Sequence, residues 1–372
     1  MSNSYVVGLD QGGTAVNATV LADDGTFLVG ELIETPSRVT EGPDAALAAL
    51  TTALDGVLEA VGLDRSAVSA VGLDTPGPAS AEGRFSSRGS TNFGHDGWRN
   101  YDIRGGLAQH VGLPVTYTND GNAAALYAHQ VHFGTRAPRT SSMSAIVGTG
   151  LGGGLVQNGQ IISGAAGMAG EVGHVHVPTV GLLEPDQPLP SCNCGFTGDA
   201  ESIASLTGIR RNLLPYWLGR FPGHPLADLD IAEAAKQLRD YAERGDELAS
   251  AVFRQQAKAI GALFTIVANV TDPHAFFLGG GVVEAGSAFR DWFLDEVRDA
   301  TRLRDEQQAI VEFALVPDRD MAGARGAALA ALAAGGAADA GKADGSASEL
   351  VLGEASDARS SGGRSESAAT SR

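Results

Sequence analysis

The stretch YVVGLDQGGT, residues 5–14, predicts more about the fold than any other part of the chain. A short apolar run ends at Asp10 and is stopped by glycines, and a second β-type run follows at 15–22. Turn residues between two such runs are typical of a β-hairpin. The stretch AIVGTGLGG, residues 145–153, repeats this pattern in the second half of the chain.

One glycine-hinged hairpin in each half predicts a duplicated α/β fold whose two hairpins face each other. Set against the opening stretch, Gly12 and Gly13 correspond to Gly152 and Gly153, and Asp10 corresponds to Gly150. The alternative is a chance match between two glycine-rich turns, because the chain contains 50 glycines.

Periodicity and turn signals predict the remaining elements. A third strand is expected after the Asp-Asp-Gly turn at 23–25. A helix is expected to open at Pro43 and to end at Gly62. The third strand is expected at 27–33. Further strands are expected at 68–73 and 115–118, and further helices at 248–270 and 322–334.

Length and charge narrow the class of protein. A chain of 372 residues is long enough for two packed lobes. Its net charge of -18 predicts repulsion from nucleic-acid phosphates. The first ten residues lack the basic and apolar regions of a signal peptide, and no run approaches a membrane span. The chain also contains only two cysteines, which fits a reducing compartment. We therefore expect a cytoplasmic protein that binds neither nucleic acid nor membrane.

Three glycine-rich turns are candidate phosphate or nucleotide sites, because glycine lets the backbone N–H groups approach a phosphate. They are residues 10–14, 148–154 and 279–281. Asp10 is suited to hold Mg²⁺ through water, although an aspartate before two glycines is also a common turn. The chain has neither a G-x-x-x-x-G-K-[ST] loop nor the protein-kinase signatures.

Two further motifs carry polar groups suited to chemistry. Asn119-Asp120 follows an expected strand, where Asp120 is either a general base for a hydroxyl group or part of a helix N-cap. Cys192 and Cys194, with His174 upstream, suit tetrahedral zinc. A free cysteine more often packs as a small apolar side chain.

Taken together, these motifs resemble the ROK family of sugar kinases and sugar-responsive repressors. The resemblance covers about residues 5–335 and includes seven motifs in the same order. They are LDQGGT (9–14), TPG (75–77), NDGNAA (119–124), GTGLGG (148–153), GEVGH (170–174), CNCGFTGDAE (192–201) and LGGG (278–281).

The resemblance implies the duplicated actin/hexokinase-like (ribonuclease H-like) α/β fold, with ATP in a cleft between two lobes. The expected small lobe comprises residues 1–119 and about 320–335, and the large lobe comprises 120–319. Residues 336–372 are rich in Gly, Ala and Ser, and a disordered tail that activity does not require is expected there.

The resemblance also assigns roles to individual residues. Asp120 is expected to be the general base, and the sugar-binding set is Asn92, Asn119, Asp120, Glu171, His174 and Glu201. The set expected to bind MgATP is Asp10, Gly12, Gly13, Thr14, Thr149, Gly150, Gly152 and Gly280. Phosphoryl transfer requires mainly positioning and neutralisation of charge, which such groups supply.

The zinc loop departs from the family pattern at one position. Asp199 stands where the family usually has a third zinc-binding cysteine. Because an aspartate oxygen can bind zinc, the expected metal ligands are His174, Cys192, Cys194 and Asp199. Alternatively, His176 compensates for the missing cysteine, or zinc has been lost.

The resemblance implies an ATP-dependent hexokinase or glucokinase that phosphorylates the 6-hydroxyl group of its sugar. An amino sugar, an N-acetylhexosamine, fructose or a sugar-like cyclitol is the alternative acceptor. A non-catalytic sugar sensor is less favoured, because the first strand is expected by Tyr5 and no DNA-binding module precedes it. A homodimer or homotetramer is expected from the family.

Overall fold

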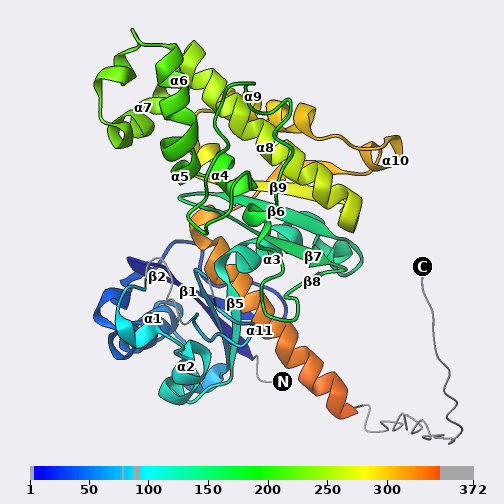
Figure 1. Cartoon of the computed structure of the whole chain (residues 1–372). Helices are drawn as coiled ribbons and strands as arrows, with labels where there is room; N and C mark the ends of the chain where they lie inside the picture. Colours follow the sequence, from blue (N-terminus) through cyan, green and yellow to red (C-terminus); the bar gives the residue numbers. More distant parts are fainter. Residues whose placement is uncertain (1–3, 78, 87–92, 344–372) are drawn as a thin grey trace, which may run out of the picture. The chain divides into compact units, whose positions relative to one another are not determined.

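The computed structural model describes residues 4–77, 79–86 and 93–343. Residues 1–335 form one compact unit, which is built on two five-stranded sheets (Figure 1). The first sheet has the order β3-β2-β1-β4-β5, and the second has the order β10-β9-β6-β7-β8. The strands are β1 (Tyr5–Gln11), β2 (Ala15–Ala22), β3 (Glu34–Pro36), β4 (Val68–Thr75), β5 (Val115–Asn119), β6 (Ser142–Val147), β7 (Leu151–Gln157), β8 (Gln160–Ile161), β9 (Ala275–Gly280) and β10 (Glu312–Leu315).

Each sheet carries helices, and short helical turns join the larger elements. The α-helices are α1 (Pro43–Val61), α2 (Ile103–Val111), α3 (Asp120–Phe133), α4 (Ala200–Ala204), α5 (Leu206–Gly208), α6 (Leu214–Arg220), α7 (Ile231–Glu243), α8 (Glu247–Thr271), α9 (Ser287–Ala300), α10 (Asp305–Gln308) and α11 (Arg319–Ala343). A π-helical turn covers Ile209–Leu213. The 3-10 turns are Val39–Glu41, Arg65–Ala67, Asp96–Trp98, Gly134–Arg139, Val172–His174, Pro225–Asp228 and Gly281–Glu284.

The two sheets have the same topology, which confirms the predicted duplication. In the first sheet β1 is antiparallel to β2 and parallel to β4, and β4 is parallel to β5. In the second sheet β6, β7, β9 and β10 repeat these relations in the same order. The predicted residue correspondence between the hairpins was wrong. Gln11 and Val147 end the equivalent strands, so Gly12 corresponds to Gly148 rather than to Gly152.

The predicted third strand at 27–33 was also wrong. Only Phe27 forms an isolated bridge, with Leu21, and the third strand is the short β3. The segment keeps only scattered backbone hydrogen bonds to β2, at Leu28 and Ile33, and it also contacts Arg325 of α11. The Arg325 guanidinium lies over the Phe27 ring and donates a hydrogen bond to the Val29 carbonyl at 3.2 Å. Phe27 thereby packs edge-on against Tyr127 of α3.

The predicted helix ends are confirmed where proline and glycine mark them. Pro43 is the first residue of α1, where its missing N–H group costs nothing. Gly62 adopts a φ of 69° after the last turn, a conformation that favours glycine. Leucines and valines of α1 are buried against the first sheet, while Phe264 of α8 stacks on Phe276 of β9 in the second. No helix in the described part of the chain combines the length and apolar character needed to cross a membrane.

α3 and α11 pack closely between the two sheets. A Cβ atom at Gly8 or Gly72 would collide with the backbone of α11, and one at Gly326 would collide with the backbone of α3. A Cβ atom at Gly121 would lie 2.5 Å from the Gly153 carbonyl of β7. These missing side chains bring the ends of β1, β4 and α3 together, and those ends carry the acidic groups of the candidate site.

Candidate active site

Two aspartates end adjacent parallel strands of the first sheet. Asp10 on β1 and Asp74 on β4 are register partners, as are the preceding pairs Gly8 with Gly72 and Leu9 with Leu73. Neighbouring residues in register place their side chains on the same face. Asp10 accepts a hydrogen bond from the Asn17 amide at 3.3 Å, and Asn17 also reaches the Asp320 carbonyl at 3.2 Å. Burial raises the pKa of both carboxyl groups, and repulsion from Asp10 raises that of Asp74 further.

Asp120 begins α3 directly after β5. Asn119 is the N-cap of this helix, and its side-chain oxygen accepts a hydrogen bond from the Asn122 N–H at 2.8 Å. The Asp120 carboxylate accepts one from the Gly121 N–H at 2.7 Å. Desolvation by the surrounding protein raises the pKa of Asp120 to about 7, with further contributions from the charges of Asp10 and Glu171. Asn119 therefore caps the helix, and Asp120 is a solvent-accessible carboxylate next to other acids.

Glu171, His174 and Glu201 form a second polar group near Asp120. Glu171 precedes the turn Val172–His174, and burial raises its pKa. Glu201 lies in the first turn of α4, and its Oε2 accepts a hydrogen bond from the Leu151 N–H at 2.9 Å. The pKa of His174 is raised to about 9, mainly by its hydrogen bond to Asp199 and also by the Glu201 charge. The structure thus brings together Asp10, Asp120, Glu171, His174 and Glu201 from four separate segments.

The glycine-rich turn at 148–150 joins β6 to β7 next to this group. A Cβ atom at Gly150 would lie 2.7 Å from Glu201 Oε2, so the turn packs closely against the Glu201 carboxylate of α4. The Thr149 carbonyl accepts a hydrogen bond from the Thr207 N–H at 3.2 Å, while the Thr149 side chain is exposed. Gly152 is the second residue of β7, and a Cβ atom there would meet nothing within 4 Å. This turn therefore presents backbone and a hydroxyl group to solvent.

Two further candidate nucleotide segments lie at strand ends. The turn Gly12–Thr14 follows β1, and the Gly12 N–H donates to the Ala15 carbonyl at 2.9 Å. Gly280 ends β9 with a φ of 86°, and a Cβ atom there would collide with Val147. A side chain at Gly280 is therefore excluded both by strain and by contact. Asn92, the looser sugar-binding prediction, lies outside the described residues.

The four predicted metal ligands cluster in the loop before α4. One ligand atom from each of His174, Cys192, Cys194 and Asp199 lies within 4.8 Å of every other. Asp199 Oδ2 lies 3.3 Å from His174 Nδ1 and 3.6 Å from Cys194 Sγ, and Cys192 Sγ lies 3.9 Å from His174 Nδ1. Ligand atoms around a tetrahedral zinc ion are separated by roughly 3.3–3.8 Å. His176 is outside this cluster and contacts the Phe196 ring.

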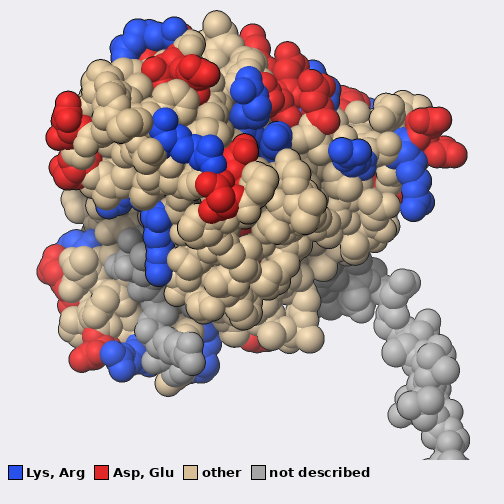
Figure 2. Space-filling model, turned by 45° about the horizontal axis from the view of Figure 1, so that its top comes forward, with Lys and Arg blue, Asp and Glu red and all other residues tan. Residues whose placement is uncertain are grey.

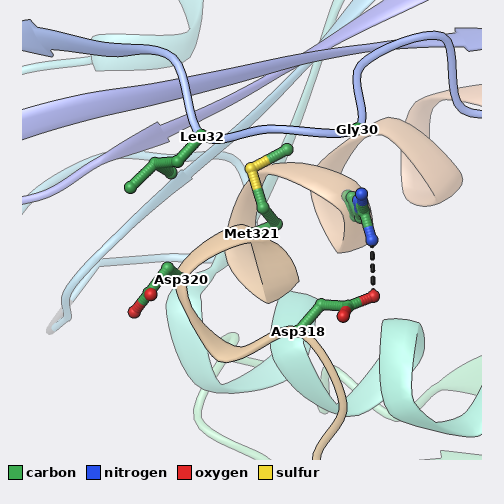
Figure 3. A pocket seen from close by; sticks show the side chains of 6 residues that line it. Gly30, Leu32, Asp318, Asp320 and Met321 are labelled. Carbon is green, nitrogen blue, oxygen red and sulfur yellow. Dashed lines mark hydrogen bonds and ion pairs between the residues drawn. The ribbon is translucent and has the colours of Figure 1, made fainter.

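An open cavity of about 360 Å³ lies at the start of α11, apart from the predicted site residues. Figure 3 shows Asp318, Asp320 and Met321 from α11 and the turn before it, facing Gly30 and Leu32 of the segment before β3. Arg325 bonds Asp318 at 2.6 Å and Tyr127 at 2.6 Å, so its charge is already paired. On the face shown in Figure 2, acidic and basic side chains are interspersed.

Asp74 is the functional candidate that sequence reasoning missed. The motif Thr75-Pro76-Gly77 drew attention to the turn, whereas Asp74 is the last residue before it and is fully buried. The available signal was a repeated tripeptide, since Gly-Leu-Asp occurs at both 8–10 and 72–74. Tyr117 was missed as well. Its hydroxyl group lies 2.8 Å from Thr75 Oγ1, and burial raises its pKa, with the charges of Asp74, Asp120 and Glu171 contributing.

Comparison with known proteins gives consistent matches over most of the chain. The glucokinase of Halalkalibacterium halodurans is 31% identical over 314 residues, covering 82% of this chain and 91% of the relative. An N-acetylmannosamine kinase of Escherichia coli is 30% identical over 329 residues, covering 87% and 97%. The solved structure of the ROK hexokinase from Thermus thermophilus superposes with a TM-score of 0.70 at 28% identity, covering 90% of this chain and 99% of that one.

These likenesses agree with the duplicated sheets and with the order of the motifs. The topology of this chain is the actin/hexokinase-like two-lobe fold of ROK sugar kinases. Residues 6–334 match the ROK family, which is almost the whole compact unit. The chain therefore belongs to the ROK family.

Proposed function

We propose that this ATP-dependent sugar kinase transfers the γ-phosphoryl group of MgATP to the 6-hydroxyl group of glucose or a closely related hexose, with Asp120 as general base. One observation carries the proposal. Asp120 is accessible to solvent at the start of α3, and desolvation by the surrounding protein together with the charges of Asp10 and Glu171 raises its pKa to about 7. A base with a pKa near the working pH takes up the proton of an attacking hydroxyl group efficiently.

The groups around Asp120 support recognition of a polyhydroxylated ring. Asn119 offers an amide, Glu171 and Glu201 offer carboxylates, and His174 offers an imidazole. Each sugar hydroxyl group both donates and accepts hydrogen bonds, so such a mixed set suits it. Asn119 and Glu201 are already held by the α3 backbone and by the Leu151 N–H, which fixes their orientation before the sugar arrives.

The turns at strand ends are proposed to bind MgATP. Asp10, Gly12, Gly13 and Thr14 would line the phosphates from the first sheet, and Thr149, Gly150 and Gly152 from the second. Gly280 would allow the nucleoside to approach the backbone. Backbone N–H groups and Mg²⁺ neutralise the charge that develops on the transferred phosphoryl group. In this proposal the small lobe comprises residues 1–119 and about 320–335, and the large lobe comprises residues 120–319.

The loop before α4 is proposed to hold zinc through His174, Cys192, Cys194 and Asp199. The cluster fits the metal, because two thiols, an imidazole and a carboxylate are all zinc ligands and their spacing suits tetrahedral geometry. Zinc bound there would fix the loop before α4, and because Asp199 also caps α4 through its Oδ1, it would hold the helix turn that carries Glu201. It would therefore position the sugar site without taking part in phosphoryl transfer.

A second acceptor has a specific observation in its favour. The E. coli relative named as an N-acetylmannosamine kinase is about as similar to this chain as the glucokinase is. The alternative acceptor is therefore an N-acetylhexosamine, an amino sugar, fructose or a cyclitol. A further alternative is a different function, that of a non-catalytic sugar sensor. A homodimer or homotetramer in the cytoplasm, with no nucleic-acid partner, stays a prediction.

The test is ADP release from MgATP across glucose, mannose, glucosamine, N-acetylmannosamine, fructose and a cyclitol. Asp120→Asn is expected to lose at least about 100-fold in turnover while it still binds the sugar. Asp299→Asn, an exposed carboxylate on α9, is the control for loss of one charge. Near-normal turnover of Asp120→Asn would contradict the base assignment. Absence of ADP release with every acceptor would favour the sensor.

A further inference from the structure

Asp74 is a buried carboxylate without a hydrogen-bond donor. Its side chain is 0% exposed, and neither carboxylate oxygen has a donor among the described residues. Because a buried polar group without a partner costs on the order of 1–3 kcal/mol, and a charged one more, such a group requires an explanation. The Thr75 hydroxyl group on the same strand bonds Tyr117 instead.

Asp74 has another carboxylate as a neighbour. Asp10 lies beside Asp74 in the parallel register. The two carboxyl groups are within hydrogen-bonding range, so each shifts the pKa of the other. Carboxylates carry only acceptor oxygens when ionised, and although a water molecule can hydrogen-bond to both, only a shared proton or a cation also offsets the repulsion between two facing carboxylates. The geometry therefore leaves two possible bridging species.

The side chains that the structure describes do not supply the positive charge. Among these side chains, which exclude that of Arg319, the ion pairs formed by arginine, lysine and histidine do not involve Asp10, Asp74 or Asp120. The early turns of α11 approach Asp10, since a Cβ atom at Gly323 would lie 2.9 Å from its Cγ. A helix N-terminus contributes only about half a positive charge, which cannot balance three acids.

We propose that Asp10 and Asp74 together bind a divalent cation of the Mg²⁺ class directly, and that they do so without nucleotide. Hard cations of this class prefer carboxylate oxygens and commonly use one or two of them. Asp74 is then a metal ligand beside Asp10, and Asp10 binds the cation directly rather than through water as the sequence suggested. The inference deepens the proposed function, because it names a cation ligand of the same site.

The test is a titration of the zinc-loaded full chain with Mn²⁺ in the absence of nucleotide, followed by electron paramagnetic resonance of the free ion. Wild type is expected to bind one Mn²⁺ per chain, and Mg²⁺ is expected to displace it. Asp74→Asn keeps the shape of the side chain but removes its charge, and we expect its affinity for Mn²⁺ to fall at least about tenfold. Asp299→Asn is expected to bind Mn²⁺ as wild type does, and all three proteins to retain the same zinc content.

Two results would overturn the inference. One is folded wild type that binds no Mn²⁺ at millimolar concentration, in which case a shared proton bridges the two acids. The other is an Asp74→Asn variant that binds Mn²⁺ as tightly as wild type. If that variant does not fold, the wild-type titration alone decides. Since no measurement involves turnover, nucleotide-free Mn²⁺ binding by a chain that phosphorylates no sugar would refute the proposed function and leave the cation site standing.

Discussion

At the scale of single residues, Asp120 sets the expected pH dependence of catalysis. The base works only when ionised, and its pKa in the folded protein is raised to about 7. Because this pKa is that of the ligand-free protein, we expect kcat/KM to be constant at higher pH and to fall as the pH drops through about 7, by close to tenfold per pH unit at the acid end. The measurement is kcat/KM for the sugar from pH 5.5 to 9. A rate that holds unchanged down to pH 5.5 would show that Asp120 is not the base.

Asp199 has two separate tasks, one for each carboxylate oxygen. Oδ1 accepts a hydrogen bond from the Ser202 N–H at 2.8 Å and so caps α4, while Oδ2 faces His174 and Cys194. Asp199→Asn keeps an oxygen for the cap but loses the anionic ligand. We expect this variant to retain α4 and to bind well below one zinc per chain, measured by elemental analysis after purification without added metal.

The matched comparison for Asp199 is a substitution to alanine, which removes both tasks. It is expected to lose the zinc and, in addition, about 1 kcal/mol of stability from the cap. Full zinc occupancy in the asparagine variant would mean that the carboxylate is not a ligand. Active wild-type enzyme without zinc would mean instead that hydrogen bonds alone hold the loop.

At the scale of elements, the contact between the first sheet and α11 depends on residues without side chains. Gly8 and Gly72 face the α11 backbone so closely that a Cβ atom has no room. Backbone cannot move aside as the end of a flexible side chain can. We expect Gly72→Ala to destabilise the protein by about 2–3 kcal/mol or more, in the range of overpacked cores. The measurement is urea unfolding followed by circular dichroism.

Gly56 on the exposed side of α1 is the control for that substitution. A Cβ atom at Gly56 meets nothing within 4 Å, so Gly56→Ala is expected to raise helix stability by up to ~1 kcal/mol. Changes of opposite sign in the free energy of unfolding would confirm that contact with α11, rather than the loss of glycine itself, destabilises the Gly72→Ala variant. A Gly72→Ala variant as stable as wild type would show that α11 can shift away from the sheet.

The elements that sequence predicted correctly are those whose signals are local. Pro43 and Gly62 mark the ends of α1 through their own backbone preferences, and the apolar runs of β1, β4 and β6 are buried strands. The strand predicted at 27–33 is wrong because the segment keeps only scattered backbone hydrogen bonds to β2, and it also contacts Arg325, which is about 300 residues away in the chain. The hairpin correspondence failed because glycines occur both in the turn at 148–150 and in the following strand, and spacing alone did not separate them.

At the scale of the whole molecule, the candidate site could be predicted in part. The motifs identified Asp10, Asp120, Glu171, His174 and Glu201, and the structure brings them into one neighbourhood. Asp74 could not be identified in this way, because its role depends on which strand lies beside β1. Strand order is a property of the assembled sheet, and no local pattern in the sequence records it.

The C-terminal part of the chain gives a prediction at this same scale. The predicted disordered tail at 336–372 lies mostly outside the described residues, and Ala331 is the last buried residue among those of α11 whose side chains are described. A chain that ends at Gly335 is therefore expected to keep its kcat, KM and melting temperature within experimental error. The measurement is the ADP-release assay together with thermal unfolding. A loss of more than about tenfold in kcat/KM would assign a role to the removed residues.

The raised pKa of Asp120 means that the pH that favours catalysis differs from the pH that favours stability. Asp120 has a higher pKa in the folded chain than the ordinary value of 3.8, so the native state binds the extra proton between about pH 4 and 7. Its contribution to stability therefore grows as the pH falls through 7, while the ionised base disappears over the same interval. Mildly acidic buffer should preserve the protein during storage and leave it idle, and returning it to neutral pH should restore the activity.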